Sequence, residues 1–438
     1  MEKLMELAKK SCDKAEVYSL QHNINSVSFE NAKLHDIETN FQSGLSLRII
    51  KDNKLGFAYT KNIQNREELI QNALDSLKGG VAANYDFPLT TKTIQLDTYD
   101  TSLEEIANTK LVEECSRVCE LLKSSANGEI MMQSGTAIDQ TRIINTAGTD
   151  ISFKNTGYYM TGNVIFPGSA AGIIRVFISK KFEPMPDNLI KEIISLYNLS
   201  SKVVTPEGGK MKVLFMPYSL FTFTGRILSG TSGKSIYEKI SPIADKMGEK
   251  IWSDKITVYD DPLNDRYPAA RPFDDEGVPT QFFPVVENGV LKNFYYDLNY
   301  AGKLKTKPTG HGYKINMWGG DSLKVKPTPF LAYLNIKAGQ KSLAQLIKSI
   351  DRGIILEGAL GGHSGNIPNG DYSVGVCPGM YVENGEIIGR VKDAMIAGNI
   401  YQTLKNVVDV GDTAYPLSLG GGLIPPILCA EVSVATKR

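Results

Sequence analysis

The chain has 438 residues, about three times the ~150 residues of a typical domain, so one small module is excluded and two domains are expected. Apolar residues make up 42% of the chain and charged residues 22%, which excludes wholesale disorder. Lysine plus arginine and aspartate plus glutamate are equal at 48 each, and the formal net charge is zero. A dedicated nucleic-acid-binding protein needs a basic excess, so we expect no nucleic-acid partner.

Charged residues interrupt every turn of the first twenty residues, and nowhere do about 18 apolar residues follow one another. We therefore expect neither a secretory signal nor a membrane anchor. The cysteines are few, odd in number and unevenly spread: Cys12, Cys115, Cys119, Cys377 and Cys429. Such a set is typical of reduced thiols, which predicts a cytoplasmic protein without a disulfide framework.

The first 200 residues predict helices around a cluster of strands. In chain order we expect a short amphipathic helix in 1–12, three to five antiparallel strands in 15–62, a helix over 64–79, an extended connector over 85–100, a helix over 102–125, strands over 129–175 and a helix near 186–198. Clustered strands favour an α+β fold over a doubly wound parallel sheet. We place a domain boundary near residue 200, between an N-terminal domain (1–200) and a C-terminal domain (201–438).

The C-terminal domain is rich in glycine, with 14 glycines in the 81 residues from Gly358 onward against 40 in 438 overall. This density predicts many tight turns in a strand-rich domain. Asn288-Gly289 and Asn384-Gly385 each lie between apolar stretches, and each predicts the tip of a hairpin.

Two short motifs suggest catalytic loops but lack a necessary glycine. The segment 229–235 (SGTSGKS) has Leu228 where a phosphate-binding loop needs its first glycine, and it predicts a flexible loop after a helix. The segment 362–366 (GHSGN) ends on Asn366, where a nucleophile elbow needs glycine. Neither a phosphate loop nor a serine hydrolase is expected.

The histidines do not form a metal-binding pattern. They are His22, His35, His311 and His363, and none is followed by glutamate or paired with another at helical spacing. A zinc peptidase usually takes two ligands from one helix and needs a carboxylate base. Taken alone, these residues do not predict a zinc hydrolase.

Several short segments follow one another in a distinctive order along nearly the whole chain. They are Ser26–Asn31 (SVSFEN), Ser43–Arg48 (SGLSLR), Met247–Lys250 (MGEK), Asp260–Pro262 (DDP), Phe273–Val278 (FDDEGV), Thr309–Gly312 (TGHG), His363–Asn366 (HSGN), Asn369–Ser373 (NGDYS) and Ala397–Ile400 (AGNI). Each segment is short, but in this common order they make the chain resemble the PmbA/TldD family, once labelled modulators of DNA gyrase.

The resemblance also implies a branch of the family. The TldD branch carries a His-Glu-x-x-x-His helix and a later cysteine that together hold zinc. Phe221, Thr222 and Arg226 stand where that helix would place its first histidine, its glutamate and its second histidine, and residues 414–426 contain no cysteine. The chain therefore resembles the PmbA/TldE branch, which implies no catalytic residue, metal ligand or cofactor of its own.

For that branch the resemblance implies a non-catalytic subunit of a cytoplasmic metallopeptidase that acts on unfolded peptides. Zinc is expected only in a TldD-like partner subunit of a heterodimer. Two alternatives stay open. One is a peptide-binding or scaffolding homodimer without enzymatic activity. The other is an independent hydrolase that uses the acidic residues Asp260, Asp261, Asp274, Asp275 and Glu276, although these also suit ordinary turns.

If the chain lines a peptide cavity, polar residues in glycine-rich turns are the candidates, because backbone can approach a ligand closely there. They are His311, His363, Ser364, Asn366 and Asp371. Ordinary turn residues are the alternative interpretation of each.

Overall fold

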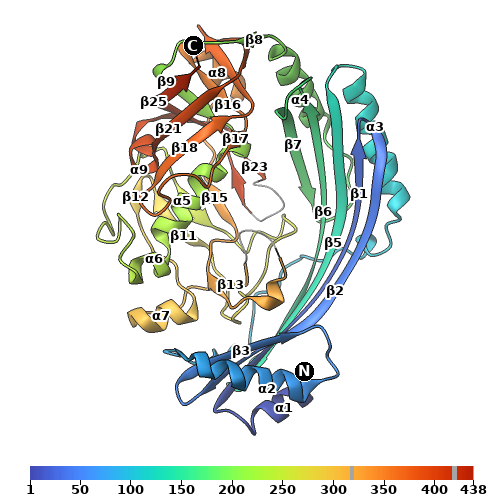
Figure 1. Cartoon of the computed structure of the whole chain (residues 1–438), viewed down its shortest axis with the longest axis vertical. Helices are drawn as coiled ribbons and strands as arrows, with labels where there is room; N and C mark the ends of the chain where they lie inside the picture. The colour runs from blue at the N-terminus through green and yellow to red at the C-terminus, as the bar shows by residue number, and fades with distance from the viewer. Residues whose placement is uncertain (316–319, 417–421, 438) are drawn as a thin grey trace.

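The computed structural model describes residues 1–315, 320–416 and 422–437, which form a bowed sheet of long strands facing a more compact, strand-rich part (Figure 1). The first part comprises α1 (Glu2–Ala8), β1 (Lys14–Glu30), β2 (Lys33–Lys51), β3 (Lys54–Thr60), α2 (Arg66–Ser76), β4 (Val81–Ala82), α3 (Asn108–Lys123), β5 (Glu129–Asn145), β6 (Asp150–Ile165), β7 (Gly172–Ser179) and α4 (Asp187–Leu199).

The second part has shorter elements. They are β8 (Val203–Val204), β9 (Gly209–Phe215), α5 (Phe221–Thr231), α6 (Gly233–Tyr237), β10 (Val258–Asp260), β11 (Phe283–Glu287), β12 (Val290–Leu291), α7 (Leu298–Leu304), β13 (Gly312–Tyr313), β14 (Thr328–Pro329), β15 (Leu334–Ile336), α8 (Leu343–Lys348), β16 (Arg352–Leu356), β17 (Ala359–Leu360), β18 (Asp371–Val376), β19 (Gly379–Glu383), β20 (Glu386–Val391), β21 (Ala394–Asn399), α9 (Ile400–Thr403), β22 (Val407–Val410), β23 (Tyr415–Pro416), β24 (Leu423–Ile424) and β25 (Ile427–Thr436).

Of the described strands, seven form the first sheet in the order β4-β3-β2-β1-β5-β6-β7, and all neighbours are antiparallel. Side chains alternate between the faces of a strand, so Val17 and Val27 of β1 share the outer face while Tyr18 and His22 share the inner face. Helices α1 and α2 cover the outer face near Val17, and α3 covers it near Val27. The inner face is turned toward the second part (Figure 1).

The second part is built on a sheet of ten of the described strands, ordered β17-β18-β21-β25-β9-β16-β19-β20-β8 with β22 on β25. Both predicted Asn-Gly tips are confirmed, at the β11–β12 and β19–β20 hairpins. Asn288 and Gly289 have φ of 46° and 79°, and Asn384 and Gly385 have 51° and 80°. Positive φ at both central residues is what a type I′ turn requires.

The α+β class is confirmed, with an antiparallel N-terminal sheet and a strand-rich C-terminal part. The first sheet ends at Ser179 and the second begins at Val203, on either side of the boundary predicted near residue 200. The division into domains at that residue stays a prediction. Among the described residues, none of the helices combines the length and the apolar character needed to cross a bilayer.

Two local predictions were wrong. The helix expected over 102–125 begins only at Asn108, because Asp100 caps a separate turn at Thr101–Leu103 by accepting from the amide of Ser102. The segment 229–235 is not a flexible loop but the end of α5 and the beginning of α6. The Ser232 side chain caps α6 by accepting from the amide of Lys234, so the second helix begins at once.

A buried ion-pair network joins the first sheet to the second part. Arg48 of β2 donates to Oε1 of Glu16 on β1 at 2.7 and 2.8 Å and to Oε1 of Glu276 at 2.6 Å. All three side chains are at most 3% exposed. The other oxygen of Glu276 accepts from the amide of Leu298 at 2.7 Å, at the first residue of α7. Glu276 therefore fixes both the sheet and α7 to one loop.

Replacing Glu276 with alanine removes one partner of Arg48 and the acceptor of the Leu298 amide. Glu16 still pairs with Arg48, but Nη1 of Arg48 and the Leu298 amide lose their buried acceptor, so we expect the free energy of unfolding to fall by about 2–4 kcal/mol. Urea unfolding followed by circular dichroism measures this change. Glu287→Ala is the matched control, because its pair with Lys292 is exposed and should contribute at most about 1 kcal/mol. Equal losses in the two variants would contradict this assignment.

Candidate functional site

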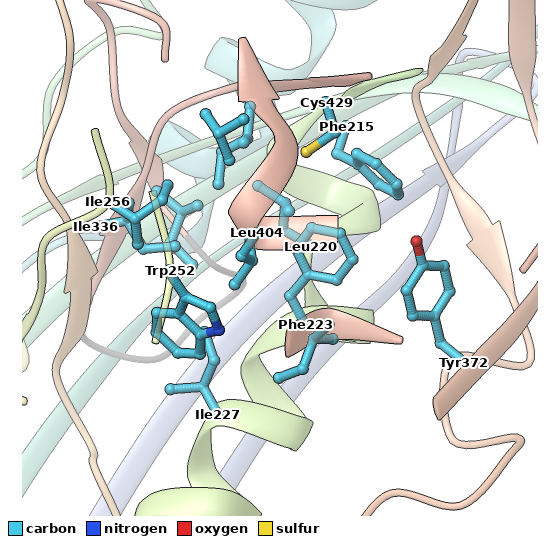
Figure 2. Close-up of a cluster of buried hydrophobic side chains, with 14 of the residues drawn as sticks. Phe215, Leu220, Phe223, Ile227, Trp252, Ile256, Ile336, Tyr372, Leu404 and Cys429 are labelled. Atoms are coloured by element: carbon cyan, nitrogen blue, oxygen red, sulfur yellow. The ribbon is translucent and has the colours of Figure 1, made fainter. Parts of the chain in front are cut away.

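Helix α5 contains the three positions that the resemblance singled out, and an apolar cluster fixes its orientation. Figure 2 shows Phe223 and Ile227 of α5 among buried side chains that include Phe215, Trp252 and Tyr372. The Phe223 ring centroid lies 4.5 Å from that of Phe215 and 5.5 Å from that of Tyr372. These contacts place α5 against β9 and β18. The neighbouring face of α5, which carries Arg226, therefore meets the loop that precedes β18.

Arg226 joins α5 to that loop, which spans residues 361–371. Its side chain is 1% exposed, and all three of its nitrogens donate to backbone carbonyl oxygens. Nε donates to Asp371 at 2.6 Å, Nη1 to Thr222 at 2.7 Å and to Gly362 at 2.8 Å, and Nη2 to Ser364 at 2.5 Å. Burial lowers the pKa of Arg226, but a guanidinium starts so high that it keeps its charge.

The other two positions are filled by groups that cannot bind a metal. The Phe221 ring lies so close to Gly362 that a Cβ at Gly362 would overlap it. Thr222 is fully buried, and its hydroxyl has no hydrogen-bond partner among the described residues. Zinc needs imidazole, thiolate or carboxylate ligands. An aromatic ring, a buried hydroxyl and a guanidinium do not fit it.

Nor does another part of the described chain gather a metal site, since no group of three or more His, Cys, Asp or Glu side chains lies close enough to hold an ion. Part of the stretch 414–426, where the resemblance places the family's cysteine, lies outside the described residues, at 417–421. The absence of bound metal stays a prediction that chemical analysis must test.

A cavity of about 320 Å³, here called the α5 cavity, lies beside the exposed side of this helix. Gly225, Leu228, Ser229 and Ser232 line it from α5 and its end. Ile367 lines it from the 361–371 loop. The Arg226 bonds therefore hold two walls of this cavity together.

Four of the predicted peptide-cavity residues, His363, Ser364, Asn366 and Asp371, share the loop that Arg226 binds. Their side chains are exposed, and none of them is among the residues that line the α5 cavity. Asp371 is the first residue of β18, and its side chain accepts from that of Asn399, its partner on β21, at 2.8 Å. Their part in peptide binding stays a prediction.

The fifth predicted residue, His311, lies elsewhere and is buried. Its Nδ1 is 2.8 Å from the Thr309 hydroxyl, and its Nε2 is 3.5 Å from Oδ2 of Asp260. The rings of Phe283 and Tyr295 pack against it. None of these partners belongs to the 361–371 loop. Tyr295 is one of the residues that line the α5 cavity, and His311 packs behind it without lining the cavity itself.

The acidic cluster at 274–276 holds loops rather than a reacting group. Asp274 accepts from the amides of Glu276 and Val278 with one oxygen and of Gly312 with the other. Asp275 accepts from Arg271 and from the amide of Lys314. Carboxylates whose oxygens are all engaged with internal donors have little left for acid–base work or a cation. This arrangement argues against a hydrolase that uses Asp274 and Asp275. Asp260 differs, because its Oδ2 has no hydrogen-bond partner among the described residues.

Replacing Arg226 with alanine leaves four carbonyls without their donors, three of them on the 361–371 loop. We expect the free energy of unfolding to fall by about 2–5 kcal/mol and amide hydrogen exchange to rise in residues 361–371. Arg266→Ala is the control, because Arg266 is exposed and should change stability by at most about 0.5 kcal/mol. Unchanged exchange in the loop would show that Arg226 does not hold it.

Comparison with known proteins finds related sequences and structures. The model described as the PmbA/TldA metallopeptidase C-terminal domain matches residues 208–436, and the model of PmbA/TldA metallopeptidase domain 1 matches residues 15–77. A metalloprotease PmbA homolog of Haemophilus influenzae is 28% identical over 429 residues, which are 93% of this chain and 89% of that protein. An uncharacterized protein of Methanocaldococcus jannaschii is 26% identical over 94% of this chain and 95% of its own length.

Among solved structures, the crystal structure of TldE from Thermococcus kodakarensis superimposes with a TM-score of 0.90 at 25% identity, covering 99% of both chains. The family models and this likeness run through both parts of the fold. The chain belongs to the PmbA/TldD family of metallopeptidase-like proteins.

Proposed function

We propose that this chain is the non-catalytic, TldE-like subunit of a two-subunit zinc metallopeptidase that degrades unfolded peptides. A TldD-like partner subunit would supply the zinc and the catalytic carboxylate. The observation that carries the proposal is that every nitrogen of the Arg226 guanidinium donates to a backbone carbonyl, on the helix where the resemblance places the zinc ligands of the TldD branch.

Charge and hydrogen bonding both support this role. A guanidinium has no lone pair to offer a metal, and its positive charge repels a divalent cation. Thr222 stands where the family's base would be, and a threonine hydroxyl cannot take up a proton as a carboxylate does. This helix therefore lacks the ligands and the base that zinc-assisted hydrolysis needs.

The supporting role would be structural. Arg226 fixes the loop 361–371 on α5 and with it one wall of the α5 cavity. A rigid wall of this kind could complete a chamber with the partner subunit and keep a peptide extended. We further propose a cytoplasmic location, which suits five cysteines that are all unpaired.

The test is co-expression of the tagged chain with a chain from the same organism that carries a His-Glu-x-x-x-His motif. We expect recovery of the two chains in equal amounts and cleavage of a fluorescent unfolded peptide by the pair only. A chelator should abolish that cleavage. A partner whose motif glutamate is replaced by glutamine serves as the control, and it should assemble without cleaving.

Cleavage by this chain alone would overturn the proposal. Recovery of a homodimer that ignores the partner and binds peptide without cleaving it would instead support the scaffolding alternative.

A further inference from the structure

A second cavity lies between the two parts of the molecule, on the inner face of the first sheet. Its volume is about 400 Å³, within the range of small-ligand sites. Tyr18 and His22 of β1 line it from the sheet, and Arg271, Tyr313 and Tyr333 line it from the second part. We call it the interdomain pocket.

His22 presents a fixed imidazole to this pocket. Its Nδ1 bonds to Oδ1 of Asp139 on β5, and the other oxygen of Asp139 is 3.4 Å from the side-chain nitrogen of Asn155 on β6. Because Asp139 holds Nδ1, the ring orientation is set and Nε2 has no hydrogen-bond partner among the described residues. The His22 side chain is 29% exposed, so a ligand can reach it. The bond to Asp139 raises the pKa of His22, which favours the imidazolium.

Arg271 presents a second fixed cation. Its Nε donates to the carbonyl of Phe273 at 3.0 Å, and its Nη2 donates to Asp275 at 2.6 Å. The guanidinium lies 5.0 Å from the Phe153 ring centroid and 5.2 Å from that of Tyr313, and it also interacts with the Tyr333 hydroxyl. A guanidinium carries five N–H donors, so these bonds leave donors over.

Tyr313 provides an independent sign of a missing ligand. Its side chain is 1% exposed, and its hydroxyl has no hydrogen-bond partner among the described residues. Buried hydroxyls are rarely left in this state unless a water or a ligand completes them. The hydroxyl belongs to a residue that lines the interdomain pocket.

The remaining charges of the pocket are already engaged. The carboxylates of Asp139 and Asp275 bind the two cations. Lys314 donates to the carbonyl of Val325 at 2.8 Å, and its ammonium lies over the rings of Tyr18 and Phe57. The lining thus offers more unused donors than acceptors, beside aromatic walls.

We propose that the interdomain pocket binds a carboxylate next to an apolar group, through His22 and Arg271. The proposed function indicates the source of this carboxylate, which we take to be the C-terminal residue of a peptide. This part of the proposal rests on the proposed function. Charge-assisted hydrogen bonds from a guanidinium and an imidazolium suit a carboxylate. The aromatic walls suit the apolar side chain that accompanies it.

Calorimetric titration of the full chain alone tests this proposal, because it requires neither the partner subunit nor zinc. The probes are N-acetyl-Ala-Ala-Phe with a free carboxylate, the same peptide as its C-terminal amide, and N-acetylphenylalanine. We expect the acid to bind about tenfold or more tightly than the amide. Equal affinity of acid and amide, or no binding of either, would overturn the proposal. Equal binding of N-acetylphenylalanine would support the carboxylate site but overturn a peptide as its source.

His22→Gln should weaken binding of the acid about tenfold without changing binding of the amide. His35→Gln is the matched control, since His35 is an exposed histidine of β2 outside the pocket. The affinity of this variant for the acid should equal that of the wild type. Thermal melts of both variants serve as the check that each is folded.

Binding should also weaken as the pH rises through the pKa of His22, and His22→Gln should lessen this dependence. Burial lowers the pKa of Lys314 to about 7, so this lysine contributes a part of the dependence that both proteins keep. The charged groups that accompany His22 in the pocket, Asp139, Arg271, Asp275 and Lys314, are present in both forms. A wild-type affinity that does not change with pH would contradict the role of the imidazolium.

Discussion

The arrangement around α5 depends on one buried cation. Burying a guanidinium is costly unless its donors are satisfied, and Arg226 satisfies them with carbonyls of α5 and of the 361–371 loop. The same bonds have two consequences. They fix the loop that borders the α5 cavity, and they keep a permanent positive charge on α5, at the position that the resemblance assigns to a zinc ligand.

Two more buried arginines connect the two parts of the molecule in a related way. Arg48 lies between Glu16 of the first sheet and Glu276 of the second part. Arg175 of β7 lies between Glu192 of α4, at 2.6 Å, and Glu357, which follows β16. Buried ion pairs add little net stability compared with apolar residues, but losing one of their partners is costly. They set how the inner face of the sheet meets the second part and therefore shape the interdomain pocket.

Much of the fold could be predicted from the sequence, because the signals were local. Alternating residues marked the long strands, and Asn-Gly pairs marked two hairpins whose positive φ values only such residues adopt readily. The helix over 102–125 and the segment 229–235 were wrong because single side-chain caps, Asp100 and Ser232, moved the boundaries.

The sites were less predictable, because their partners are far apart in sequence. The sequence places Arg226 at the ligand position but gives no sign that its acceptors would be carbonyls more than 130 residues away. His22, Asp139 and Arg271 carried no shared motif, and only the pairing of β1 with β5 and the docking of the second part bring them together. The acidic cluster at 274–276 had the composition of a catalytic site, but backbone amides and Arg271 occupy the oxygens of Asp274 and Asp275.

The most direct test of the supporting role is the zinc content of the chain purified alone, after dialysis against zinc and then against metal-free buffer. Mass spectrometry of the metal should find far less than one zinc per chain, because Phe221, Thr222 and Arg226 offer no ligand. One tightly held zinc per chain, lost when Arg226 or its neighbours on α5 are replaced, would contradict the account.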